Sequence, residues 1–91
     1  MWHTIDPDGR RVDMHVRGWR HIVEAHPQLR VDPETVLAAV SSPERRAPGR
    51  AHGEEWFYRG NAGPSRWLKV VVHYEDNRGL IVTAFPRRSF P

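Results

Sequence analysis

The chain has 91 residues, no cysteine, and 14 lysine and arginine residues against 11 acidic ones, which gives a formal net charge of +3. Most independent domains are about 100–150 residues long, so this length allows one domain with one small core. The absence of cysteine excludes a disulfide framework and a thiolate metal site. The first residues resemble no signal peptide, and no apolar run is long enough to cross a bilayer. We therefore expect a cytoplasmic protein without a membrane segment.

Thirteen of the 14 basic residues are arginine, and Lys69 is the only lysine. Arginine presents a planar fork that grips phosphate through two hydrogen bonds and stacks on bases, so this bias suits a nucleic acid partner. A GC-rich genome would also produce this bias, because it favours arginine codons over lysine codons in every protein. The net charge of +3 is also modest. The composition permits nucleic acid binding without demonstrating it.

Residues 1–14 predict an extended arm or hairpin, closed by a Pro-Asp-Gly turn. Residues 15–43 predict two helices. In the first, apolar residues recur at helical spacing from Val16 to Val23, and Pro27 ends the helix at or before His26. The second begins at Asp32, which caps it, with Pro33 in the first turn.

Residues 44–86 predict an antiparallel sheet. Residues 44–53 are polar and form a loop or a weak edge strand, while 55–59, 67–74 and 80–85 are rich in β-branched and aromatic residues. Glycine-containing turns separate these runs. The whole chain is thus expected to be a single α+β domain over residues 1–91, with helices on one side of the sheet.

Alternation along residues 67–74 separates two faces of the sheet. Leu68, Val70, Val72 and Tyr74 point one way and form the face that packs on the helices. Trp67, Lys69, Val71 and His73 point the other way. A sheet face that carries Lys69 and His73 is available for a ligand.

Several residue types suit the cleavage of RNA by its own 2′-hydroxyl, which needs a base, an acid and cations around the phosphate. His21, His26 and Glu24 are candidates for the proton transfers. Positions 21 and 26 differ by about 140° on a helix, so both reach one site only if the helix ends near residue 25. Arg59 follows aromatic residues and could clamp a phosphate. Thr83 could orient a phosphate oxygen.

Each of these residues also has a structural interpretation. His21 could be a surface position on its helix, and His26 could favour the helix dipole at the C-terminus. Arg59 could pair with a carboxylate, and Thr83 could be present for its β-propensity. No pair of histidines has the spacing of a zinc site, so we expect no metal.

The order of the motifs is similar to a known superfamily. Trp19-Arg20-His21-Ile22 followed by His26-Pro27-Gln28-Leu29 resembles the opening of small nucleases of the barnase–EndoU–colicin–RelE superfamily, above all its phage-type and polymorphic-toxin branches. Phe57-Tyr58-Arg59 and the runs 70–72 and 81–85 resemble the strands that follow. The resemblance covers residues 12–86.

This resemblance implies two N-terminal helices packed on a curved antiparallel sheet, which we expect to have three to five strands. It also implies a metal-independent ribonuclease without a cofactor, acting as a toxin on RNA and inhibited by an acidic antitoxin or immunity protein. The implied catalytic residues are His21, His26, Arg59 and Thr83. The substrate contacts that we expect beside them are Glu24, Tyr58, Arg66, Lys69 and His73.

Two other hypotheses remain open at this point. One is a non-catalytic RNA- or protein-binding module on the same fold, which would bind RNA in a salt-sensitive manner without turnover. The other is a structural or interaction domain, which would do neither.

Overall fold

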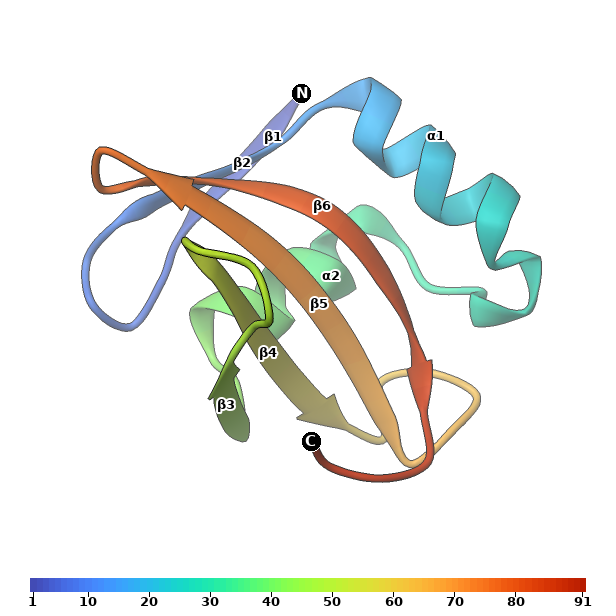
Figure 1. Cartoon of the computed structure of the whole chain (residues 1–91). Coiled ribbons are helices and arrows are strands. Elements are labelled where there is room, and N and C mark those ends of the chain that lie inside the picture. The colour runs from blue at the N-terminus through green and yellow to red at the C-terminus, as the bar shows by residue number, and fades with distance from the viewer.

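Two α-helices, one short 3-10 helix and six strands make up the computed structural model, which describes residues 1–91 (Figure 1). The helices are α1 (Val16–Ala25), η1 (Pro27–Leu29) and α2 (Pro33–Ser41). The strands are β1 (Trp2–Ile5), β2 (Arg11–Met14), β3 (Arg45–Pro48), β4 (Glu54–Gly60), β5 (Trp67–Glu75) and β6 (Arg78–Arg87). They form one sheet in the order β1-β2-β6-β5-β4-β3, in which β2 and β6 are parallel and the other neighbours antiparallel.

The expectation of two N-terminal helices on an antiparallel sheet of three to five strands was wrong. The sheet has six strands, it is mixed, and β1 and β2 precede both helices. The N-terminal hairpin does not stand apart as an arm, because β2 pairs with β6 from Arg11–Arg78 to Asp13–Leu80. The polar residues 45–48 form a full edge strand on β4. The molecule remains an α+β domain.

The two helices take different positions against the sheet (Figure 1). In Figure 1, α2 lies behind the sheet and covers its far face, whereas α1 runs beside β6. Because β2 pairs only with residues 78–80, the rest of β6 lacks a strand partner on that side, and α1 takes the place beside it. The helix backbone comes close to the strand at Gly18, where a Cβ would be in van der Waals contact with the Ile81 carbonyl oxygen at 3.4 Å. Neither helix is long and apolar enough to span a membrane.

The core lies between α2 and the sheet. Asp32 caps α2 by accepting a hydrogen bond from the Thr35 backbone N–H at 2.9 Å, which satisfies a free donor of the first turn. The buried residues of α2 meet the side chains of β4 and β5 that point toward it: Val36, Ala39, Val40, Phe57, Leu68, Val70 and Val72.

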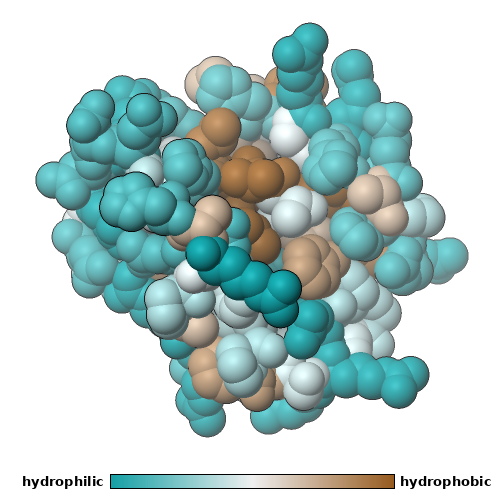
Figure 2. Space-filling view, viewed as in Figure 1, coloured by the Kyte–Doolittle hydropathy of each residue, from teal (hydrophilic) through white to brown (hydrophobic).

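The opposite face of β4, β5 and β6 is covered by neither helix, and we call it the open face. Across the strands Tyr58 pairs with Lys69 and Lys69 with Phe85, while Trp56 pairs with Val71 and Val71 with Thr83. Figure 1 is viewed from this side, and Figure 2 shows hydrophobic side chains gathered over the middle of the sheet with hydrophilic ones around them.

A network of paired charges holds the N-terminal hairpin to the sheet, and we call it the paired corner (Asp6, Asp8, Arg10, Arg46, Glu55 and Tyr74). The buried Asp6 carboxylate accepts hydrogen bonds from the Tyr74 hydroxyl at 2.6 Å and from Arg10 Nε at 2.8 Å. Arg10 also donates to both oxygens of Glu55 at 2.9 Å. Arg46 joins the network by pairing with Asp8 at 2.8 Å.

Candidate functional site

The only lysine of the chain lies at the centre of the open face. Lys69 Nζ is 3.3 Å from the centroid of the Trp56 ring, 5.4 Å from that of Phe85 and 5.7 Å from that of Tyr58. The residue is only 5% exposed. No carboxylate lies within ion-pair distance of its ammonium group. The ammonium group therefore contacts ring faces, and no ion pair neutralises its buried positive charge.

Burying the Lys69 ammonium group without an ion-pair partner costs desolvation free energy. Burial lowers the pKa of Lys69, and the positive charges of Arg87 and Arg50 lower it further, against the opposing effect of Glu54. The Glu54 carboxylate is already bound to the Trp56 indole N–H at 2.7 Å. Cation–π contacts offset part of the desolvation cost but supply no hydrogen-bond acceptor. A ligand that brings negatively charged oxygens would supply the missing partner.

Two hydroxyl groups also lack partners. Tyr58 OH and Thr83 Oγ1 are buried and make no hydrogen bond. Burial raises the pKa of Tyr58, so its phenol stays protonated at neutral pH and remains a donor. A buried polar group without a partner costs free energy, and few occur in native proteins. On the open face the unpaired groups are an ammonium and two hydroxyls, all of which can donate to an anion.

Arginine side chains surround one end of this face. The guanidinium carbon of Arg66 lies 4.4 Å from the centroid of the Trp67 ring, and that of Arg45 lies 5.9 Å from it. Arg87 is the cross-strand partner of Trp67. None of the three pairs with an acidic side chain. Arg45 donates to the Glu44 carbonyl and Arg87 to the main-chain oxygen of Pro91. Cations that alternate with aromatic rings are typical of single-stranded nucleic acid sites.

One histidine contacts the open face. α1 ends at Ala25, and the backbone of His26 turns away with φ −134° and ψ 65°. Its half-buried imidazole lies 5.5 Å from the Phe85 ring, centroid to centroid, at an interplanar angle of 33°. Lys69 contacts the same Phe85 ring. An imidazole is therefore placed at the border of the face that carries the unpaired ammonium.

The structure thus brings together some of the residues predicted from the sequence. Five of them line or border the open face: His26, Tyr58, Arg66, Lys69 and Thr83.

Four other predicted residues lie elsewhere. His21 and Glu24 are exposed on α1 and make no hydrogen bond or ion pair of their side chains. Arg59 points to the helix side of the sheet, where its Nη1 donates to the Ser42 carbonyl at 2.6 Å. His73 is exposed, about 13 Å along β5 from Lys69 at the usual strand rise.

Sequence reasoning missed several members of this site: Arg45, Trp56, Phe85 and Arg87. Strand alternation places Trp67 and Lys69 on one face, but their neighbours depend on the register of three strands. That register contains an irregularity between Val71 and Val72, which alternation along one strand cannot reveal.

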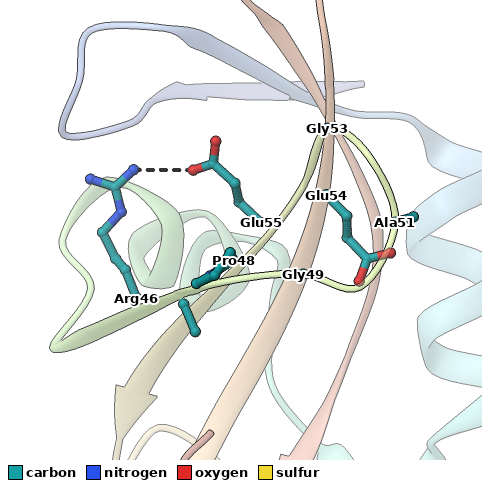
Figure 3. Close-up of a pocket in the computed structure, with 8 residues that line it drawn as sticks. Arg46, Pro48, Gly49, Ala51, Gly53, Glu54 and Glu55 are labelled. Atoms are coloured by element: carbon teal, nitrogen blue, oxygen red, sulfur yellow. Dashed lines mark hydrogen bonds and ion pairs between the residues drawn. The ribbon is translucent and has the colours of Figure 1, made fainter.

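A separate hollow of about 440 Å³ lies within the β3–β4 hairpin (Figure 3). Figure 3 shows Glu54 and Glu55 directed to opposite sides of β4, with Glu55 paired to Arg46. Glu54 is bound to the Trp56 indole and to the Arg50 backbone N–H. Because these carboxylates are already paired and would repel an anion, this hollow is a poor phosphate site. No three His, Asp or Glu side chains are grouped as a metal site would require.

Comparison of the chain with protein-family models, with curated proteins and with solved structures finds no match. What the open face can do is therefore derived from its own chemistry. It offers unpaired donors for an anion, ring faces for stacking, arginines at its rim and one imidazole.

Proposed function

We propose that this protein is a small ribonuclease that cleaves single-stranded RNA on the open face. The observation that carries the proposal is the buried, unpaired Lys69 ammonium, which lies among aromatic rings with the unpaired hydroxyls of Tyr58 and Thr83 on the same face. A phosphodiester supplies the oxygen acceptors that these three groups lack, and its neighbouring bases supply partners for the rings. The resemblance of residues 19–29 to small nucleases supports the same proposal.

The reaction begins with the 2′-hydroxyl of the substrate attacking the adjacent phosphorus. The attacking oxygen gives up its proton to a base, the bond from phosphorus to the 5′-oxygen breaks, and that oxygen receives a proton from an acid. The products are a 2′,3′-cyclic phosphate and a free 5′-hydroxyl. Negative charge grows on the phosphate oxygens on the way, and fixed donors nearby stabilise it.

We assign one of the two proton transfers to His26, because its ring contacts Phe85 at the border of the face and histidine is the side chain best suited to acid–base work near neutral pH. Lys69 stabilises the phosphate charge. Its lowered pKa also makes it a better proton donor to the leaving oxygen than an ordinary lysine. Tyr58 and Thr83 hold the non-bridging oxygens through their hydroxyls.

The test is an incubation of the purified protein with a single-stranded RNA in EDTA, with analysis of the fragment ends. We expect cyclic phosphate ends, and we expect His26→Ala to slow cleavage by about 10²- to 10⁴-fold, the usual contribution of a general acid or base. His3→Ala is the matched control, since His3 is exposed on β1. Cleavage that survives His26→Ala unchanged contradicts the assignment.

His21→Ala separates the geometry from the sequence resemblance. His21 lies on the same helix as His26 but makes no contact with the open face, so the geometry predicts a variant that cleaves like the wild type. A loss as large as that of His26→Ala would mean that α1 presents its outer side to the substrate.

A second candidate function is RNA binding without cleavage. One observation favours it. Cleavage needs both a base and an acid, whereas His26 is the only imidazole in contact with the rings of this face. In that case the folded protein binds single-stranded RNA with an affinity that falls steeply with salt, and incubation releases no fragments.

A further inference from the structure

The segment that follows β6 folds back over one end of the open face. The Phe90 ring lies 4.7 Å from the Tyr58 ring, centroid to centroid, at 83°, and 6.3 Å from the Trp67 ring at 53°. Tyr58 and Trp67 contact each other at 6.2 Å. Figure 1 shows the chain after β6 curving back toward β4.

Few other contacts hold this segment in place. Residues 88–91 belong to no helix or strand, and none of the backbone hydrogen bonds outside those elements involves them. One side-chain hydrogen bond joins the segment to the end of β6, from Arg87 to the Pro91 main-chain oxygen at 3.1 Å. Phe90 itself is 39% exposed. Its attachment to the face therefore depends mainly on the two ring contacts.

The position that Phe90 occupies suits a nucleobase. It is bounded by the Tyr58 and Trp67 rings, which are nearly perpendicular at 83°, so a base that stacks on one ring meets the other edge to face. The guanidinium groups of Arg66 and Arg45 lie beside the Trp67 ring at 4.4 and 5.9 Å. Lys69 lies next to the other ring, at 5.7 Å from its centroid. A base stacked here would have cations on both sides for its flanking phosphates. The Tyr58 hydroxyl, which has no partner, could then hydrogen-bond to the ligand.

We infer that Tyr58 and Trp67 form an aromatic subsite for one base of single-stranded RNA, and that Phe90 occupies this subsite when no RNA is bound. The inference rests on the proposed function and adds the position of one base. Because Phe90 and the base compete for the same rings, the apparent affinity for RNA is reduced by the fraction of molecules in which the subsite is closed.

The test compares wild type, Phe90→Ala, Phe90→Trp and Ser89→Ala in binding to a labelled oligouridine with 2′-O-methyl groups. This probe lacks the attacking hydroxyl and stays intact. An abasic oligonucleotide with the same backbone is the second probe. We expect Phe90→Ala to tighten binding of the oligouridine by about 3- to 30-fold and to leave the abasic probe unchanged. Phe90→Trp keeps the ring, and Ser89→Ala leaves the ring contacts intact, so neither should tighten binding.

Two results would count against the inference in different ways. If the wild type binds the oligouridine and Phe90→Ala binds it equally or more weakly, or tightens both probes alike, the subsite is not where we place it and the proposed function stands. If no form of the folded protein binds either probe at low salt, the proposed function fails and the inference fails with it. Since Phe90 is partly exposed, its replacement should leave the fold intact, which a thermal unfolding curve checks.

Discussion

The paired corner and the open face are built from the same kinds of side chain and arranged in opposite ways. In the corner Arg10 and Arg46 meet Asp6, Asp8 and Glu55, and every charge has a partner of opposite sign. Beside it Arg11 and Arg78 share Asp13. On the open face Lys69, Arg45 and Arg66 make no ion pair with an acidic side chain.

This difference separates charges that are paired within the fold from charges that, in our proposal, are paired by a ligand. The hydrogen bonds of the paired corner join the β1–β2 hairpin to β3, β4 and β5, so they form when the chain folds. The open face keeps a buried ammonium and two buried hydroxyls unpaired, at a cost to stability. Groups with such perturbed environments concentrate at functional sites.

The largest effect should come from breaking the corner at Asp6. Asp6→Ala leaves the Tyr74 hydroxyl and the Arg10 guanidinium without their buried acceptor, and we expect a loss of about 3–5 kcal/mol in the free energy of unfolding. Urea denaturation measures it. Asp8→Ala is the control, because Asp8 is exposed and its loss should be much smaller. Equal losses from the two variants would contradict the claim that the paired corner depends mainly on the buried Asp6 carboxylate.

Acid should weaken the corner next. Burial alone would raise the pKa of Asp6, but hydrogen bonds from Tyr74 and Arg10 outweigh it and lower the pKa below its usual 3.8. A hydrogen bond from Arg11 likewise lowers the pKa of Asp13, against the effect of burial. The stability that these carboxylates confer is therefore full above the unfolded-state pKa and is lost as the pH falls through the folded-state values.

We expect the urea midpoint to fall between pH about 5 and pH about 3, and Asp6→Asn to show a weaker fall over that range. Glu24→Gln, which removes an exposed carboxylate without a partner, is the control and should follow the wild type. An Asp6→Asn variant with the same acid dependence as the wild type would show that the ion pairs of the corner do not set it.

A smaller effect should distinguish the arginines of the two regions. Each phosphate contact to single-stranded RNA contributes about −0.7 to the slope of log K against log salt concentration. Arg66→Gln should reduce the slope by about this amount, because Arg66 has no acidic partner on the open face. Arg46→Gln, from the corner, should leave the slope unchanged. If both variants change it alike, the RNA contacts are not confined to the open face.

Local patterns were enough to find the helices and the strands β4, β5 and β6, because each has its own periodicity and turns. The pairing of β2 with β6 could not be predicted in this way, since it joins residues that are 67 positions apart. The edge strand β3 has a polar sequence, and it forms because β4 offers it an unpaired edge. These two pairings account for the difference between the expected sheet and the observed one.

For the site, alternation along one strand was enough to place Lys69 on the face away from the helices. Its neighbours Trp56 and Phe85 come from other strands and follow only from the register. Arg59 shows the converse, because its place after aromatic residues suggested a phosphate clamp whereas its side chain lies toward α2. The packing of Phe90 on Tyr58 had no signal in the sequence.

The central claim is that Lys69 is kept for a ligand at the expense of stability, and Lys69→Met tests it most directly. Methionine has a similar shape and needs no acceptor. We expect the free energy of unfolding to stay the same or rise, while binding to single-stranded RNA weakens by about 10- to 100-fold, the value of one or two hydrogen bonds to a charged group. A variant that is clearly destabilised and still binds RNA like the wild type would show that Lys69 serves the fold, and would contradict our account.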